Sequence, residues 1–394
     1  MKLFLNECGV VCALGDTHGE IKRRLLREAD SGVAPTEEWS AGRMLPLGRV
    51  TTALPDAAAL PLEQRSRNNQ LALAALAQIR PALEAAIARY GAARIGVVVG
   101  TSTSGISATE SALRVLAGGG ELPAGFHYAQ QEMGSPAAML ARELGLAGPA
   151  YVHSSACSSS AKAMASAARL IRMGLCDAVL TGGVDTLCAF TVAGFGALES
   201  VSAARCNPLS ANRNGINIGE GAALFLMSAE PAAVALCGWG ESSDGHHMSA
   251  PDPAGGGARI AIAQALARAG IEPADIDYIN LHGTATLQND AMESRVIADM
   301  FGPAVPVSST KPFTGHTLGA AAAVEAALCW LAMQDDNPTG VLPPQLWDGV
   351  PDPALPVLDA VAPGRALGRP LRYALSNSFA FGGSNAALVL GRTS

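Results

Sequence analysis

One cysteine of the chain stands where a thiol could act as a nucleophile. The segment Tyr151–Ser160 reads YVHSSACSSS and continues into AKAMASAARLIRMG, where apolar residues recur at helical spacing until Gly174. Cys157 is therefore predicted to lie where a strand and a turn of small residues meet the start of a helix. The unpaired N–H groups and the dipole of a helix start favour the nucleophilic thiolate. By local context alone, however, such a cysteine is more often a small buried core residue.

Two histidines and a lysine downstream strengthen the catalytic interpretation. His282 precedes GTAT, and Lys311 and His316 stand in the glycine-bounded segment SSTKPFTGHTLG. Each segment follows a strand-like run and precedes a helical one, which is where sites collect in α/β folds. Neutral imidazole N–H groups could hold the enolate formed when a malonyl thioester loses its carboxylate, and the carbanion could then attack an acyl thioester on sulfur. A lone histidine is otherwise more often structural.

Strand-like and helical segments alternate along the chain and would position these residues. The alternation predicts an α/β layered fold, and uninterrupted apolar strands fit sheets covered on both faces. The composition changes most at residues 240–257, which we take as the join between two halves, 1–240 and 241–394; the alternative is a long surface loop. Strands are predicted at Arg94–Gly100, Asp177–Gly183, Ala222–Ser228 and Asp277–His282, and helices at Gln70–Arg89, Ser158–Gly174, Gly257–Ala269 and Leu318–Met333.

Composition narrows the class of protein. The 394 residues are 49% hydrophobic, enough to bury a large core, and the net charge is −7. No basic run interleaved with aromatics is present, so nucleic-acid binding is not expected. The eight cysteines form no CxxC and no Cys/His cluster with zinc spacing, so no metal site is expected. We expect no membrane span and no cleaved leader, and we expect free thiols in the reducing cytoplasm.

Four motifs, in order, resemble the β-ketoacyl synthase family, especially its elongating members. They are SACSSS around Cys157, HGTAT around His282, STKPFTGHTLGAA around Lys311 and His316, and NSFAFGGSN at Asn377–Asn385. With weaker matches, such as GTSTSGI and RNGINIGEGAAL, the resemblance runs from roughly Gly96 to the end. It implies a thiolase-like fold of two similar α/β halves in five layers, a dimer, and substrates carried on the phosphopantetheine of an acyl carrier protein, with no other cofactor.

The resemblance also implies a role for each matching residue. Cys157 would carry the acyl group, while His282 and His316 would bind the malonyl thioester and stabilise its enolate. Lys311 would support His316. The remaining roles are Glu325 as the buried acidic partner, Asp290 and Glu293 as braces of the His282 segment, Thr284, Thr286 and Phe379 as substrate contacts, and Phe381 as the gate of the acyl pocket, whose N–H would form an oxyanion hole with that of Cys157.

The catalytic set distinguishes subclasses of the family. Starter-unit synthases resemble Cys-His-Asn and thiolases Cys-His-Cys, whereas this chain has Cys-His-His, which indicates decarboxylative elongation. The stretch Arg65–Ala75 (RSRNNQLALAA), with PFTGHTLGAA and NDAMES, resembles synthases of aryl polyene pigment pathways. Those often pair with a partner that lacks the nucleophile, so a heterodimer or a homodimer is expected. Fatty-acid elongation is the alternative pathway, and a non-catalytic chain-length-determining subunit is the alternative of another class.

Two further features concern a turn and a docking surface. The family usually has HGT-x-T-P-x-G-D, whereas Leu287 and Asn289 stand here for the Pro and the Gly. Because Asn tolerates positive φ, Asn289 is expected to preserve the turn.

An acyl carrier protein is acidic, so a net-negative enzyme needs a local basic patch to bind it. Arg65 and Arg67 are the candidates, and the alternative is an ordinary solvated helix start.

Overall fold

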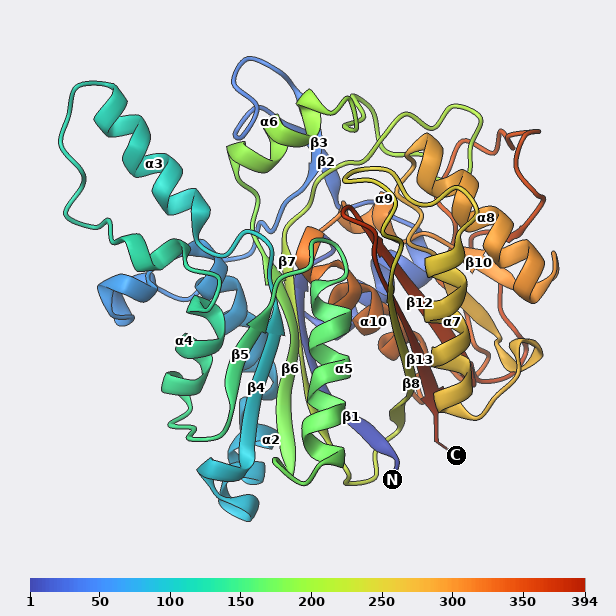
Figure 1. Ribbon diagram of the computed structural model, residues 1–394, viewed down its shortest axis with the longest axis horizontal. Helices are drawn as coiled ribbons and strands as arrows, with labels where there is room; N and C mark the ends of the chain where they lie inside the picture. The colour runs from blue at the N-terminus through green and yellow to red at the C-terminus, as the bar shows by residue number, and fades with distance from the viewer. Residues whose placement is uncertain (394) are drawn as a thin grey trace.

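All strands but two form one continuous hydrogen-bonded sheet (Figure 1). The computed structural model describes residues 1–393. Its main sheet has 11 strands in the order β11-β10-β9-β12-β13-β8-β1-β7-β6-β4-β5, and a separate hairpin pairs β2 with β3. The strands are β1 (Leu3–Cys12), β2 (Val33–Thr36), β3 (Leu45–Gly48), β4 (Ile95–Gly100), β5 (Ala150–His153), β6 (Ala178–Asp185), β7 (Gly221–Ser228), β8 (Val234–Ser243), β9 (Tyr278–Asn280), β10 (Pro306–Ser308), β11 (Asp359–Ala360), β12 (Tyr373–Ala380) and β13 (Ser384–Arg392).

The two halves of this sheet repeat one topology. The first half runs β5-β4-β6-β7-β1, and the second runs β10-β9-β12-β13-β8 when the edge strand β11 is left out. If the strands of each half are numbered in chain order, both halves place them in the order third, second, fourth, fifth, first. In both halves the first two pairs of neighbouring strands in that order are parallel and the last two pairs are antiparallel, so only the fifth strand, β7 or β13, runs against the other four. The halves join where Leu3 and Phe4 of β1 pair with β8. The second repeat therefore begins at Val234, and the sequence-based division at 240/241 falls inside β8, because the break in composition marks the loop that follows this strand.

Helices cover both outer faces of the sheet and fill the space between its halves, which gives the five layers that the resemblance implies (Figure 1). Successive residues of β7 alternate between layers: Phe225 packs toward the central helices and Leu224 toward the outer ones. The helices are α2 (Arg67–Tyr90) and α4 (Ser135–Glu143) outside the first half, α5 (Ser159–Arg172) and α10 (Ala321–Ala332) in the centre, α7 (Gly256–Ala269) and α8 (Leu287–Phe301) outside the second half, and the peripheral α1 (His18–Lys22), α3 (Ile106–Ala117), α6 (Ala189–Ala197) and α9 (Lys311–Thr314).

The two central helices differ from an ordinary surface helix. Every residue of α10 is buried, and ten of the fourteen residues of α5 are buried. Both therefore lack a wide polar face, and the Ala-rich sequence lets the neighbouring backbones approach closely. The predicted helix Leu318–Met333 is confirmed, but its first turn, Leu318–Ala320, is a tighter 3-10 turn.

Helix α2 is, within residues 1–393, the one helix that is long and apolar enough to cross a membrane by length and composition alone. The structure places it along the outer face of the first half of the sheet, where Leu71, Leu76 and Ile79 enter the same core cluster as Val97 and Leu224. The apolar face of α2 is thus packed against the sheet, and α2 belongs to the outer helical layer of the first half.

Candidate active site

The turn before α5 presents Cys157 at the carboxyl end of β5. Ala156 has a positive φ of 50°, and the hydroxyl of Ser159 accepts from the N–H of Ser155 at 2.9 Å and donates to the carbonyl of Ala156 at 2.6 Å. These bonds hold the turn directly ahead of the helix that begins at Ser159. The predicted place of Cys157, between a strand and a helix start, is therefore confirmed.

The thiol of Cys157 is not ionised by this environment. Burial raises its pKa to about 11, although the charge of Lys311 and the N–H groups of Phe381 and of Cys157 itself act in the opposite direction. The expectation that the helix start would favour a thiolate is thus wrong in its net direction, because the cost of desolvating an anion exceeds the gain from the nearby donors. The two backbone N–H groups that lower the pKa of the thiol are those that the resemblance assigns to the oxyanion hole.

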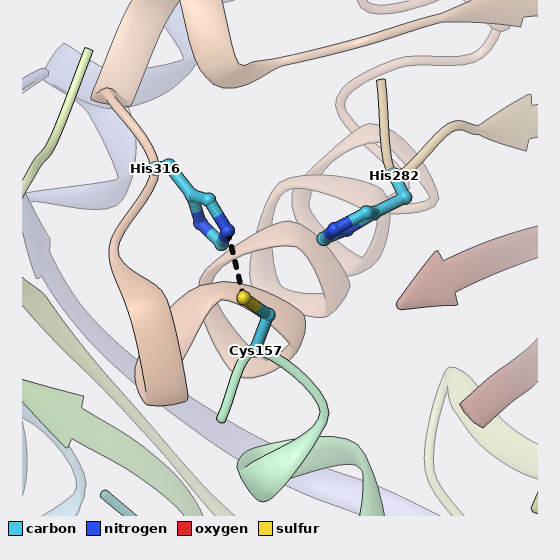
Figure 2. Close-up of side chains that lie close together, drawn as sticks. All are labelled: Cys157, His282 and His316. Carbon is cyan, nitrogen blue, oxygen red and sulfur yellow. Dashed lines mark hydrogen bonds between the residues drawn. The ribbon is translucent and has the colours of Figure 1, made fainter. Parts of the chain in front are cut away.

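His316 presents an N–H to the sulfur. Its Nε2 lies 3.0 Å from Sγ of Cys157, as the dashed line in Figure 2 shows. The backbone N–H of Leu318 donates to Nδ1 at 3.3 Å, so Nδ1 is the acceptor and Nε2 carries the hydrogen. Burial and the charge of Lys311 hold the pKa of His316 well below its usual value, so the ring is neutral at physiological pH.

His282 is held in the equivalent tautomer by a lysine. Lys311 Nζ lies 3.4 Å from Nδ1 of His282 and also donates to the His282 carbonyl. An ammonium can only donate, so Nε2 of His282 carries the hydrogen. Burial, then the charge of Lys311, keeps the pKa of His282 well below its usual value. The two imidazole rings, 5.4 Å apart and nearly perpendicular, both point toward Cys157 (Figure 2).

Lys311 is neutralised by Glu325 from the central helix α10. The two side chains are 2% and 3% exposed, and Nζ donates to Oε1 at 2.5 Å. Burial raises the pKa of Glu325 while Lys311 opposes the shift. The predicted buried pair is confirmed, but the expected support of His316 is corrected: Lys311 contacts His282 and acts on His316 only through its charge.

Two buried carboxylates brace the segment that carries His282. Glu293 accepts from the N–H groups of His282 and Gly283, both at 2.8 Å, and Asp290 accepts from the N–H of Ala285 at 3.2 Å. Both predicted braces are confirmed by these contacts. Asn289 does not preserve a turn through positive φ, because it lies inside helix α8; the positive φ is at Ala285, 63°.

Two cavities adjoin at the site and share Ser200, His282, Thr284, Thr286 and Phe381 in their walls. Phe195 and Phe381 form an aromatic gate at the smaller, inner one. The inner cavity, about 10 Å³, is lined by Cys157 and His316 and lies beside Phe195 and Phe381, whose rings are 5.6 Å apart. Phe381 also lines the outer cavity, about 140 Å³. The outer cavity has the other three expected substrate contacts in its wall: Thr284, Thr286 and Phe379. The inner cavity is too small for an acyl chain, so such a chain requires the aromatic gate to move.

Sequence reasoning missed residues that support or line the site. Asp185, fully buried at the end of β6, accepts from the hydroxyl of Thr101 at 2.6 Å and from the N–H of Gly319 at 2.6 Å. It thereby ties the loop after β4 to the loop of His316. The signal was a lone acid after an apolar run, in TGGVD. Phe195 gave no comparable signal, because its role depends on how α6 packs.

The two arginines proposed for carrier docking make internal contacts. Arg67 forms an ion pair at 2.5 Å with Glu220, which is fully buried, and also donates to the carbonyl of Val50. Arg65 donates to the carbonyls of Leu60 and Ala58. The structure therefore gives Arg67 a structural role. Of the two docking candidates, only Arg65 forms no ion pair with another of residues 1–393.

The thiol and the two imidazoles also have donor atoms of the kind that bind zinc. Their ligand atoms all lie within 4.8 Å of one another. The ammonium of Lys311 beside His282 opposes a further cation at this point. The same geometry suits two N–H donors directed at an oxygen anion.

A thiol next to two neutral imidazole N–H groups, carried at the strand ends of a five-layer repeated α/β fold, defines a condensing enzyme of the thiolase-like class. The chain belongs to the β-ketoacyl synthase family: residues 9–232 match its N-terminal domain and residues 233–346 its C-terminal domain. The chain is therefore of the acyltransferase type that 3-oxoacyl-acyl carrier protein synthases represent.

Individual relatives match over most of the chain. Nodulation protein E of Rhizobium sp. (strain N33) is 35% identical over 98% of both chains. 3-Oxoacyl-[acyl-carrier-protein] synthase 2 of Staphylococcus aureus is 33% identical over 75% of this chain and 76% of its own. Among solved structures, the ketosynthase ApeO in complex with its chain length factor ApeC, from Xenorhabdus doucetiae, superposes with a TM-score of 0.93 at 45% identity, covering 100% of this chain and 98% of that one.

Proposed function

We propose that the protein is a catalytic β-ketoacyl-acyl carrier protein synthase that performs a decarboxylative Claisen condensation. The observation that carries the proposal is the convergence of two Nε2–H groups, from His282 and His316, on a thiol that also faces two backbone N–H donors. A non-catalytic chain-length-determining subunit would need none of these contacts, and their joint presence favours the enzyme.

The first half-reaction transfers the acyl group to Cys157. Sulfur attacks the carbonyl carbon of the acyl-carrier thioester, and the N–H groups of Cys157 and Phe381 hold the oxyanion. The bond between that carbon and the pantetheine sulfur then breaks. The proton of the Cys157 thiol goes to the departing pantetheine thiol, and the new thioester stays on the enzyme.

The second half-reaction uses the two imidazoles. A malonyl thioester binds with its carbonyl oxygen at the Nε2–H groups of His282 and His316, and its carboxylate leaves as CO2. The electron pair of the broken C–C bond forms an enolate, which the two N–H donors stabilise. The enolate carbon attacks the acyl carbon on Cys157, and the C–S bond breaks. The Cys157 sulfur leaves as a thiolate and takes up a proton from solvent, which restores the thiol, and the β-ketoacyl chain leaves on the carrier.

The pathway and the partners form the finer part of the proposal. We assign the enzyme to aryl polyene or related type II polyketide synthesis, with an acyl carrier protein as substrate carrier; the 45% identity to ApeO supports this over fatty-acid elongation. The ishigamide ketosynthase/chain length factor is a further structural neighbour, with a TM-score of 0.88 at 28% identity. A second ketosynthase-like subunit would cover the exposed apolar residues of α3, which lie on the side where β5 forms the edge of the sheet (Figure 1).

The test follows the acyl group. The protein is incubated with acyl-carrier thioesters, and the adduct is located by mass spectrometry; malonyl-carrier protein is then added, and CO2 and β-ketoacyl product are measured. We expect one acyl group on Cys157, no adduct in Cys157→Ala, and an unchanged adduct in Cys237→Ala, which removes a half-buried thiol outside the site. Turnover that persists in Cys157→Ala would refute the mechanism.

Starter preference decides the pathway. Aromatic and saturated acyl-carrier thioesters are compared in the same assay, each with and without a coexpressed nucleophile-less subunit. Faster acylation by the aromatic starter supports the aryl polyene assignment, and a preference for saturated chains without any second subunit favours fatty-acid elongation.

A further inference from the structure

A lysine on the central helix α5 reaches the segment that carries the gate. Lys162 Nζ donates to the hydroxyl of Ser384 at 2.5 Å, and the Ser384 and Ser158 hydroxyls are 2.9 Å apart. Ser158 in turn donates to the carbonyl of Ser155 at 2.9 Å. Because the ammonium can only donate, the hydrogen bonds run in one direction, from Lys162 through Ser384 and Ser158 to the carbonyl of Ser155.

This chain of hydrogen bonds joins the two sources of the oxyanion hole. Ser158 directly follows Cys157, and Ser384 follows Phe381 after only Gly382 and Gly383. The backbone N–H groups of Cys157 and Phe381 both act to lower the pKa of the thiol. The contact between Ser158 and Ser384 therefore ties together, from just outside the site, the two segments that carry these N–H groups.

Phe381 must move to admit an acyl chain, and the hydrogen-bonded set Lys162, Ser384 and Ser158 lies next to the two glycines that follow Phe381. The inner cavity of about 10 Å³ admits no acyl chain while Phe381 closes it. Gly382 and Gly383 have φ values of 83° and 74°, which favour glycine. The N–H of Gly382 donates to the carbonyl of Met248 at 2.8 Å, and the carbonyl of Gly383 accepts from the N–H of Asp244 at 2.8 Å, so a change of conformation at this pair has to break these bonds. Ser384 is the first residue of β13 and is the fixed end from which Phe381 swings.

Lys162 acts through position, not through its charge on the thiol. The cation that lowers the pKa of Cys157 is Lys311. Near Lys162, Glu241 is already paired with Arg169, and within residues 1–393 Lys162 forms no ion pair of its own. The half-buried ammonium has lost part of its hydration, and Ser384 is the polar group that its Nζ contacts.

We propose that Lys162 is a positioning residue: with Ser384 and Ser158 it forms a latch that returns the Phe381 N–H to the oxyanion hole after the gate has opened. This inference rests on the proposed function, since it concerns the acylation of Cys157.

The test separates oxyanion stabilisation from thiol reactivity. Acylation of Cys157 by an acyl-carrier thioester forms an oxyanion, whereas alkylation by iodoacetamide displaces iodide at a saturated carbon and forms none. Lys162→Met and Ser384→Ala are each expected to slow acylation by on the order of tenfold, less than the loss of a whole oxyanion donor. Alkylation should change less than twofold, which also shows that the variants are folded around the thiol.

Coupling and controls complete the experiment. Lys162→Met/Ser384→Ala should acylate no more slowly than the slower single variant, because both changes break one network. Lys162→Arg should recover part of the rate, and Arg172→Met, which removes an exposed cation at the far end of α5, should have no effect. Normal acylation in both single variants, an equal loss of alkylation, or independent effects in the double variant would overturn the latch. A wild type that forms no adduct would overturn the proposed function, and the latch with it.

Discussion

Cys157 is kept as a neutral thiol, and its two histidines are kept as neutral donors. All three follow from burial, which disfavours any charge at these positions, and Lys311 depresses the pKa values of both histidines further. Since Nε2 of His316 already carries a hydrogen, it can donate to an anion but cannot take up the thiol proton. In the reaction proposed above, the two histidines can therefore stabilise the enolate, while the thiol has to lose its proton in surroundings that favour the neutral form.

The protonation of Cys157 predicts a pH profile. Below a pKa of about 11, the thiolate fraction rises about tenfold for each pH unit. We expect the rate of iodoacetamide alkylation at Cys157 to rise steadily between pH 7 and pH 10. Peptide mass spectrometry with Cys157→Ala as the blank measures this rate apart from the other seven thiols. A plateau below pH 8 would contradict the raised pKa.

The buried ion pair predicts a stability difference. Lys311→Met leaves the carboxylate of Glu325 buried without its partner and should lower the free energy of unfolding by about 3–5 kcal/mol. Lys311→Met/Glu325→Leu should recover most of this loss, although neither variant should condense malonyl thioesters. Urea unfolding measures both.

The unpaired Glu325 makes the stability of Lys311→Met depend on pH. Without Lys311, the pKa of Glu325 in the folded state stays above its unfolded value, since burial raises it. Folding is then penalised as pH rises through the range between the two values, so the loss in Lys311→Met should be smaller at pH 5 than at pH 8. A double variant as unstable as the single one would show that the pair is not the cause.

At the scale of elements, the site depends on how closely a helix start approaches a strand end. A Cβ on Gly100, at the end of β4, would lie 2.3 Å from the backbone nitrogen of Ser160 in α5. The strand therefore fixes how deep the Cys157 turn sits. Cys157, His282 and His316 come from the loops after β5, β9 and β10, all at the carboxyl ends of parallel strands.

Gly100→Ala should disturb this approach. We expect a loss of about 1–3 kcal/mol in the free energy of unfolding, because backbone atoms cannot move aside, and a slower acylation of Cys157. Gly194→Ala is the control, since a Cβ there meets nothing within 4 Å and the residue is helical. Thermal unfolding of both variants makes the comparison, and equal behaviour would show that the contact between β4 and α5 is slack.

At the scale of the whole molecule, two equivalent halves meet at the central helices, and the first contributes the thiol while the second contributes both imidazoles. One surface remains without cover in the single chain. Leu113 and Leu116 of α3 are 53% and 48% exposed, on a helix that stands away from the body of the protein (Figure 1). Apolar exposure of this kind is typical of a subunit interface.

Charges placed on α3 should therefore separate subunits. We expect Leu113→Glu/Leu116→Glu to shift the protein from dimer to monomer, or to abolish binding of a nucleophile-less partner, while the fold persists because both side chains are exposed. Light scattering after size exclusion measures the mass. Val357→Glu, at a position 82% exposed, is the control and should change nothing. An unchanged assembly in the α3 variant would place the interface elsewhere.

Local patterns were sufficient for the chemistry and for the elements that carry it. The types and order of Cys157, His282, Lys311 and His316 indicated a decarboxylative condensation, and their strand and helix contexts followed from apolar periodicity. The strand and helix contexts depend on neighbours within one or two turns of the chain, and the residue types and their order are visible in the sequence itself.

Only the tertiary structure decided what these residues touch and whether they are charged. Lys311 contacts His282 instead of His316, and Arg67 forms an ion pair with Glu220. Lys162 donates to Ser384, which lies 222 positions further along the chain. The tertiary structure also reversed the expected ionisation of Cys157. Burial and contacts between distant segments set each of these outcomes, and neither is encoded in the local spacing of residue types.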